Sequence, residues 1–302
     1  MFSRRHPYLF FLLVFTAIIA GSTFIISLLA MIGQHQSDMG FSDKVGIVEL
    51  TGIISDSKKI LSQIKDFREN DSIKAIVLRI DSPGGAVGPS QEIYREIQKT
   101  KKSKKVIASM GAIAASGGYY VAAATDGIVA NPGTITGSIG VILGYTNFRE
   151  LFEKIGLYPV VIKSGKYKDI GSPVRKMTET EKSLLQKFSD TVHHQFIKDV
   201  AKGRRMQIED IQKLADGRIF SGETAKTLGL VDRLGNLEDA IEWAGRLGGI
   251  KGKVSSVYPP EEKLPFMKYL LDMSVTEIRE IINNSATSMI TGGYLFNPGK
   301  EH

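Results

Sequence analysis

Short apolar runs alternate with amphipathic stretches along residues 44–162, and this pattern predicts strands separated by helices. The apolar runs indicate buried strands at 45–50, 75–80, 105–110, 127–130 and 158–162. Apolar residues at helical spacing predict helices at 57–68, 90–100, 116–124 and 148–155. This alternation predicts a layered α/β fold with parallel strands.

The pattern becomes mainly helical after residue 177. Thr178 and Glu181 have the spacing of a capping box, which predicts a long amphipathic helix reaching about Lys202. Further helices are expected at 208–215, 222–228 and 237–245, with a last strand at 254–257. The tail, 256–302, contains an amphipathic stretch at 264–282. We expect it to pack on the core or a neighbouring subunit, with a membrane surface as the alternative.

The N-terminal segment predicts a membrane anchor. Residues 7–37 contain no Asp, Glu, Lys or Arg, and 8–32 are long enough to span a bilayer. Arg4 and Arg5 precede this stretch, so residues 1–7 are expected in the cytoplasm and the rest outside it. Residues 33–43 are interpreted as a tether, and 44–255 as the main domain. A cleaved signal peptide is the alternative, but its apolar core is normally shorter.

Composition narrows the chemistry. The net charge of +7 is scattered, and its densest cluster, at 101–105, has no aromatic residues interleaved, so no nucleic-acid partner is predicted. The absence of cysteine excludes a thiol nucleophile, disulfides and thiolate metal sites. We predict no cofactor and no metal.

Ser116 is the candidate nucleophile. It lies between small residues and glycines, directly after the apolar run at 106–110. A serine that opens a helix after a strand can present its hydroxyl to a cleft, and the glycines that follow let a carbonyl approach backbone N–H groups. The alternative is a closely packed strand-to-helix turn without chemistry.

A nucleophilic serine needs a base, and the sequence offers histidines and lysines. His193 and His194 are adjacent on the long amphipathic helix, where surface positions are more common, so a Ser-His-Asp triad is disfavoured. The segment 163–173 carries three lysines, and a lysine acts as a base when burial lowers its pKa. From the residues alone, these lysines could equally be solvated. Ser138, in a small-residue loop, could hydrogen-bond such an amine.

Five ordered motifs carry a resemblance to a known family. They are DSPGG at 81–85, MGAIAASGGYY at 110–120, GSIG at 137–140, KSGKYKD at 163–169, and GRIFSG at 217–222 with AKTLGLVD at 225–232. Together they resemble the signal peptide peptidases of the bacterial S49 family, which are Ser/Lys-dyad membrane proteases. The resemblance covers about residues 44–250 and implies a ClpP/crotonase-like spiral of ββα units with a helical C-terminal part.

The resemblance also implies the roles of individual residues. Ser116 matches the nucleophile, Lys168 the general base and Ser138 the serine that hydrogen-bonds this base. Gly85 matches the oxyanion-hole glycine, with the N–H of Gly117 as its partner. The expected activity is hydrolysis of remnant signal peptides at the bacterial cytoplasmic membrane. The catalytic domain would be extracytoplasmic, in a homo-oligomeric ring anchored in membrane lipid.

Three alternatives share some of these features. A protease of the same mechanism could act on whole membrane proteins for quality control. A crotonase-type enzyme acting on acyl-CoA would share the oxyanion hole, although an extracytoplasmic domain argues against it. A non-catalytic scaffold with this fold would not need Ser116 or Lys168.

Overall fold

The computed structural model describes residues 7–36, 43–260 and 291–295. The chain divides into two compact units, Met1–Ser42 and Asp43–His302. The first contains helix α2 (Pro7–Gln36), which includes the segment predicted to be helical at 8–32. Over the described ranges, no helix meets the length and hydropathy required of a membrane span. The helix is confirmed, and its placement in a membrane stays a prediction.

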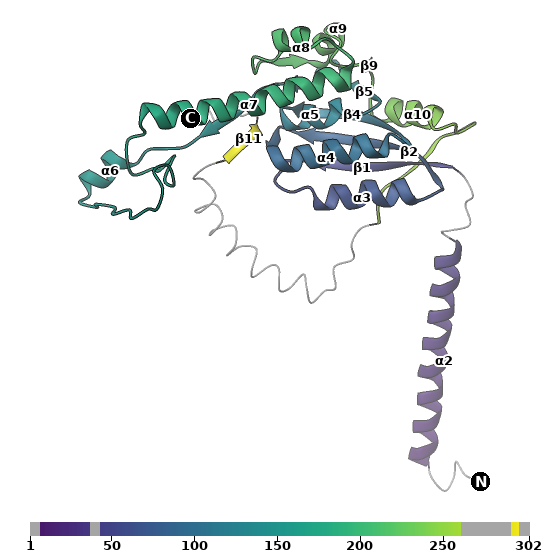
Figure 1. Ribbon diagram of the computed structural model, residues 1–302. Coiled ribbons are helices and arrows are strands. Elements are labelled where there is room, and N and C mark those ends of the chain that lie inside the picture. Colours follow the sequence, from purple (N-terminus) through teal and green to yellow (C-terminus); the bar gives the residue numbers. More distant parts are fainter. Residues whose placement is uncertain (1–6, 37–42, 261–290, 296–302) are drawn as a thin grey trace. The chain divides into compact units, whose positions relative to one another are not determined.

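The second unit is built on a mainly parallel sheet, as the sequence predicted (Figure 1). Within the described residues this sheet has eight strands, in the order β10-β1-β2-β4-β5-β9, with β6 beside β4 and β8 beside β6. Only the β6–β8 pair is antiparallel among them. The bounds are β1 Lys44–Thr51, β2 Ile73–Ser82, β4 Lys105–Ala115, β5 Gly127–Ala130, β6 Ile135–Gly137, β8 Ile219–Ser221, β9 Arg233–Leu234 and β10 Ser255–Val257.

Helices cover both faces of the sheet. On one face α3 (Lys58–Glu69), α4 (Val87–Thr100) and α5 (Gly117–Ala123) pack on the larger apolar cluster, which includes Leu78 of β2. On the other face α10 (Leu237–Leu247) packs on a smaller cluster that includes Val77. Neighbouring residues of β2 thus enter opposite cores, and this explains its continuous apolar run.

The C-terminal helices follow the predicted pattern. They are α7 (Glu179–Arg204), α8 (Ile208–Leu214) and α9 (Gly222–Thr227). Thr178 and Glu181 form the expected capping box at the start of α7. Apart from Glu181, the buried residues of α7 lie between Val192 and Ala201, so only its second half packs on the core.

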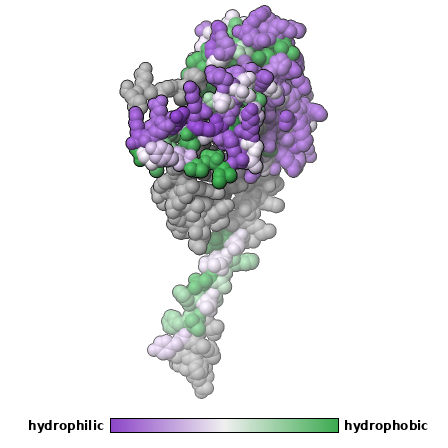
Figure 2. Space-filling view, turned by 60° about the vertical axis from the view of Figure 1, so that its left-hand side comes forward, coloured by the Kyte–Doolittle hydropathy of each residue, from purple (hydrophilic) through white to green (hydrophobic). Residues whose placement is uncertain are grey.

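The strand predicted at 158–162 is wrong. These residues form neither helix nor strand, and Tyr158, Val160 and Ile162 are 77%, 86% and 96% exposed. An apolar run becomes a strand only where a neighbouring strand can accept its backbone hydrogen bonds, and this segment has no such neighbour in the described chain. It belongs to residues 145–177, here called the arm, which contain the short helix α6 (Arg149–Lys154). Figure 2 views the side on which α6 lies and shows apolar groups among hydrophilic ones.

A second sheet was not predicted. It consists of β3 (Gly84–Ala86), β7 (Ile142–Gly144) and β11 (Thr291–Leu295), with β11 in the middle and antiparallel to both. Strand β11 is the yellow arrow in Figure 1. Tyr294 is opposite Gly85, and Gly293 is opposite both Ala86 and Ile142. Part of the tail therefore adds a strand to the second unit, while the amphipathic stretch at 264–282 lies outside the described residues.

Candidate active site

Ser116 occupies a strained position at the end of β4. It is the N-cap residue of α5, and its φ of 53° and ψ of −118° lie where L-residues are rare. Its N–H donates to the carbonyl of Gly137 (2.9 Å), and its carbonyl accepts from the N–H of Tyr120 (2.8 Å). Such strain costs about 1–3 kcal/mol and gathers at functional sites. The backbone hydrogen bonds hold Ser116 in this conformation.

The two candidate oxyanion-hole glycines lie side by side. A Cβ built on Gly117 would be 3.2 Å from the backbone nitrogen of Gly85 and 2.7 Å from the Oγ of Ser90. A Cβ on Gly85 would lie 2.3 Å from the carbonyl oxygen of Ile54, so only glycine fits there. The turn before α4 therefore brings the backbone nitrogen of Gly85 close to Gly117, the residue after Ser116, a proximity that an oxyanion hole requires.

Ser138 adjoins the same site. Gly137, which accepts the hydrogen bond from Ser116, directly precedes it in sequence. The N–H of Ser138 donates to the carbonyl of Arg218 (2.8 Å), and its φ of 50° is again unusual for a non-glycine residue. Ser138 lines a pocket of about 470 Å³ together with Gly140, Val141, Ile142, Gln186, Ser189, Asp190, His193, Ala215, Asp216 and Gly217. The predicted nucleophile, oxyanion-hole and supporting residues are thus assembled at one end of the sheet.

The structure distinguishes the three lysines of the arm. Lys163 forms an ion pair with Asp169, so its amine is already engaged. The amine of Lys166 lies 5.3 Å from the ring centre of Tyr167. Lys168 is exposed, and within the described residues its amine makes no hydrogen bond or ion pair. Of the three, Lys168 is the one whose amine is uncommitted.

Lys168 and Ser116 are not brought together by the contacts described. The residue after Lys168, Asp169, is linked through Arg175 to Glu181 at the start of α7. In contrast, α5 contacts α7 near Phe196, whose ring centre is 5.0 Å from that of Tyr120. No hydrogen bond or ion pair among the described residues joins Lys168 to Ser116, so the pairing of these two residues stays a prediction.

The structure gives little support to the alternative in which a histidine acts as the base for Ser116. His194 is exposed, while His193 is half-buried and lines the pocket beside Ser138. The Nε2 atom of His193 is buried without a hydrogen-bond partner in the described structure. No hydrogen bond from it to Ser116 or Ser138 is found there, so neither histidine is placed as a base for the serine.

Two features of the site escaped the sequence analysis. One is strand β11, which lies against Gly85 in β3. The other is the cluster of Arg175 with Asp169 and Glu181. The capping box gave a partial signal for Glu181, but nothing in the spacing indicated that its carboxylate also binds Arg175.

A strained serine at the end of a sheet in this fold is compatible with a serine protease, and the comparisons with known proteins assign the class. Residues 98–251 match the family described as "Peptidase family S49", and residues 36–134 match that described as "Clp protease". The chain belongs to peptidase family S49. The sheet with its covering helices is accordingly a ClpP-like domain, and the chain is a serine protease.

Individual relatives support the same assignment. "Putative protease slr0021" of Synechocystis sp. is 45% identical over 229 residues, 75% of this chain and 82% of the relative. "Putative signal peptide peptidase SppA" of Enterococcus faecium is 41% identical over 186 residues, 61% and 54% of the two chains. "Protease 4" of Salmonella typhi is 33% identical over 230 residues, which are 76% of this chain and 37% of the relative.

Proposed function

We propose that this chain is a membrane-anchored endopeptidase that degrades remnant signal peptides, with Ser116 as nucleophile and Lys168 as general base. The observation that carries the proposal is the strained Ser116 beside the backbone amides of Gly85 and Gly117. A buried serine held at positive φ, with the backbone of a second glycine close to the residue that follows it, suits acyl transfer. The substrate class rests on the similarity to a relative whose name includes signal peptide peptidase.

The reaction follows from these roles. The neutral amine of Lys168 takes the proton of the Ser116 hydroxyl while the oxygen attacks the scissile carbonyl carbon. The N–H groups of Gly85 and Gly117 stabilise the resulting oxyanion, and Ser138 orients the amine. The lysine then returns its proton to the leaving amine as the peptide C–N bond breaks. Water, deprotonated by the same lysine, then attacks the acyl carbon, and the lysine returns that proton to the Ser116 oxygen as the bond between this oxygen and the acyl carbon breaks.

An extended peptide fits the edge of β3. Strand β11 pairs with this edge in antiparallel orientation, with Tyr294 opposite Gly85. A substrate adding a strand at the same place would present its backbone carbonyls next to the oxyanion-hole glycine. The small residues around Ser116 and Ser138 favour small or aliphatic side chains at the cleavage site.

We propose that α2 anchors the chain in the bacterial cytoplasmic membrane, with the catalytic domain extracytoplasmic. The support is sequence: no charged residue occurs between Pro7 and Ser37, and Arg4 and Arg5 precede this stretch. Fractionation of cells, followed by protease treatment of intact spheroplasts, tests it. Recovery of the full chain in the soluble fraction, or protection of the domain in spheroplasts, would contradict the proposal.

We propose that the active form is a homo-oligomeric ring. The arm exposes Ile155, Leu157, Tyr158, Val160, Val161 and Ile162, each more than half accessible. Such a surface needs a partner, and a second copy of the chain would cover it. Because Lys168 lies on the arm, a neighbouring copy could also supply this lysine to Ser116. Ile162→Asp should then shift the oligomer to smaller species in light scattering, whereas Lys154→Asp on α6 should not.

The catalytic proposal is tested with Ser116→Ala and Lys168→Ala in the full chain, assayed on a fluorogenic apolar peptide. Both variants should lose activity while keeping the wild-type oligomer. Mixing the two variants should restore up to about a quarter of the activity if the dyad joins two copies. An active Lys168→Ala variant would remove the lysine from the mechanism. Cleavage of intact membrane proteins in preference to signal peptides would instead favour the quality-control role.

A further inference from the structure

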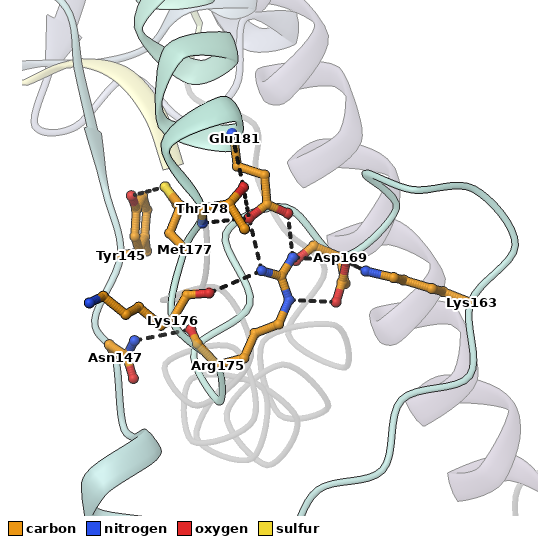
Figure 3. Close-up of polar contacts among 9 residues, drawn as sticks. All are labelled: Tyr145, Asn147, Lys163, Asp169, Arg175, Lys176, Met177, Thr178 and Glu181. Carbon is orange, nitrogen blue, oxygen red and sulfur yellow. Dashed lines mark hydrogen bonds and ion pairs between the residues drawn. The ribbon is translucent and has the colours of Figure 1, made fainter.

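The segment around Lys168 is held by charges instead of an apolar core. Residues 163–168 are exposed, and no residue of this stretch belongs to either apolar cluster of the described structure. Its conformation is instead fixed where it ends, at Asp169, whose side chain is 14% exposed. The guanidinium of Arg175 forms the centre of this contact (Figure 3).

Arg175 binds both the side chain and the backbone of Asp169. Its Nε donates to Oδ2 (2.7 Å), and its Nη2 donates to Oδ1 (2.9 Å) and to the carbonyl oxygen (3.1 Å). This is a two-pronged contact with the carboxylate, a geometry that lysine cannot reproduce. Lys163 contacts the same carboxylate from the other side, which closes the segment 163–169 on itself.

The opposite side of the guanidinium is anchored to α7. Nη1 and Nη2 of Arg175 donate to the two carboxylate oxygens of Glu181, Nη1 at 2.8 Å. The side chain of Glu181 is 4% exposed, and it also accepts from the N–H of Thr178 (2.9 Å). Arg175 thus connects the residue that follows Lys168 to the first turn of α7, where Glu181 closes the capping box.

We propose that Arg175 is a positioning residue for the catalytic base: it fixes the backbone at Asp169 and so aims the Lys168 side chain at the reacting serine. The inference rests on the proposed function of Lys168. Because Asp169 is the next residue in the chain, loss of its two-pronged contact would free the backbone from which Lys168 projects. A displacement of the base by about 1 Å can cost on the order of 100-fold in rate.

The cluster also controls charge near the base. Arg175 and Lys163 hold the pKa of Asp169 well below its usual range, and Arg175 lowers the pKa of Glu181 to about 2. The two carboxylates of the cluster therefore stay ionised down to low pH, and they lie beside the cationic side chains of Arg175 and Lys163. A carboxylate left without its cation here would stabilise the protonated form of Lys168, so a higher pH would be needed to form the neutral base.

Two substitutions with opposite charge effects test the proposal in the full-length protein. Arg175→Gln removes a cation, so kcat should fall about 10- to 100-fold and the acid limb of the kcat/KM profile should move to higher pH. Glu181→Gln removes an anion but keeps an oxygen that can accept the hydrogen bond from Thr178. The acid limb of the kcat/KM profile of this variant should therefore move to lower pH. Arg175→Lys keeps the charge, so kcat should fall without a shift. KM should change less than kcat in all three.

Arg149→Gln is the matched control, because Arg149 forms an exposed ion pair with Glu153 on α6 of the same arm. It should retain wild-type kcat and pH profile. The positioning role would be overturned, and the dyad left intact, by wild-type kcat in Arg175→Gln. An acid limb at the same pH in Arg175→Gln and Glu181→Gln would overturn it as well. Activity in Lys168→Ala would instead overturn the proposed function on which this inference rests.

Discussion

The two halves of the proposed site are held in place by different forces. Ser116, Gly85 and Gly117 lie at the end of a buried sheet, where backbone hydrogen bonds and close contacts leave no alternative positions. Lys168 lies on an exposed arm whose local shape depends on ion pairs around Arg175. The nucleophile and oxyanion hole are therefore preorganised by the fold, whereas the base depends on charge and on what the arm contacts.

The largest effect is expected at the preorganised half. Gly85→Ala would place a methyl group 2.3 Å from the carbonyl oxygen of Ile54, so the β3 backbone must shift. Displacing its N–H from the oxyanion should lower kcat about 100- to 1000-fold. Gly88→Ala is the control: this glycine lies three residues further along the chain, an added Cβ would meet no atom within 4 Å, and the variant should keep wild-type kcat. Equal activities would show that Gly85 is not an oxyanion donor.

A smaller effect, in the opposite direction, is expected from the tail. Strand β11 occupies the edge of β3 where a substrate would pair, so it should compete with substrate. Gly293→Pro removes a backbone donor from a strand paired on both sides, which should raise kcat/KM several-fold. A synthetic peptide of residues 288–298 should then inhibit this variant competitively. Unchanged kcat/KM together with no inhibition would place the substrate elsewhere.

The sequence was sufficient for the preorganised half because its determinants are local. The apolar runs of β1, β2 and β4 and the small residues after Met110 occur within single segments, so the sheet and the place of Ser116 followed from pattern. The structure added the proximity of Gly85 and Gly117, which joins residues 32 positions apart. The motifs indicated these two glycines only through family resemblance.

The structure of the arm could not be predicted from the sequence pattern, for a physical reason. The run at 158–162 has the composition of a strand, but strand formation depends on a pairing partner that composition does not reveal. The ion pairs of Arg175 could not be predicted either, because charged side chains are common in loops and the sequence does not show which of them meet. Strand β11 was missed because its pairing joins the tail to residues near position 85, across most of the chain.

The charge-held half should respond to acid before the sheet does. The pKa values of Asp169 and Glu181 are lower in the folded arm than their ordinary values of 3.8 and 4.5. The ion pairs of these carboxylates therefore stabilise the arm fully above those ordinary values, and this stabilisation is lost as the pH falls toward about 2. Pepsin should therefore cut the arm near Tyr158 faster as pH drops from 4.5 to 2. Fluorescence of Trp243, which packs against the smaller cluster, should change less over this range. Parallel changes in both signals would mean that the arm and the sheet unfold together.

The smallest effect concerns the strain at Ser116. Glycine adopts positive φ without penalty, so Ser116→Gly should be more stable than Ser116→Ala by about 1 kcal/mol although neither has a nucleophile. Thermal unfolding of the two variants measures this difference. Ser164, on the arm, has no positive φ, so Ser164→Gly should not gain stability over Ser164→Ala. If the glycine variant at 116 were no more stable than the alanine variant, the fold would not be storing strain in its nucleophile. The contrast between a preorganised serine and a charge-held lysine would then rest on hydrogen bonds and packing alone.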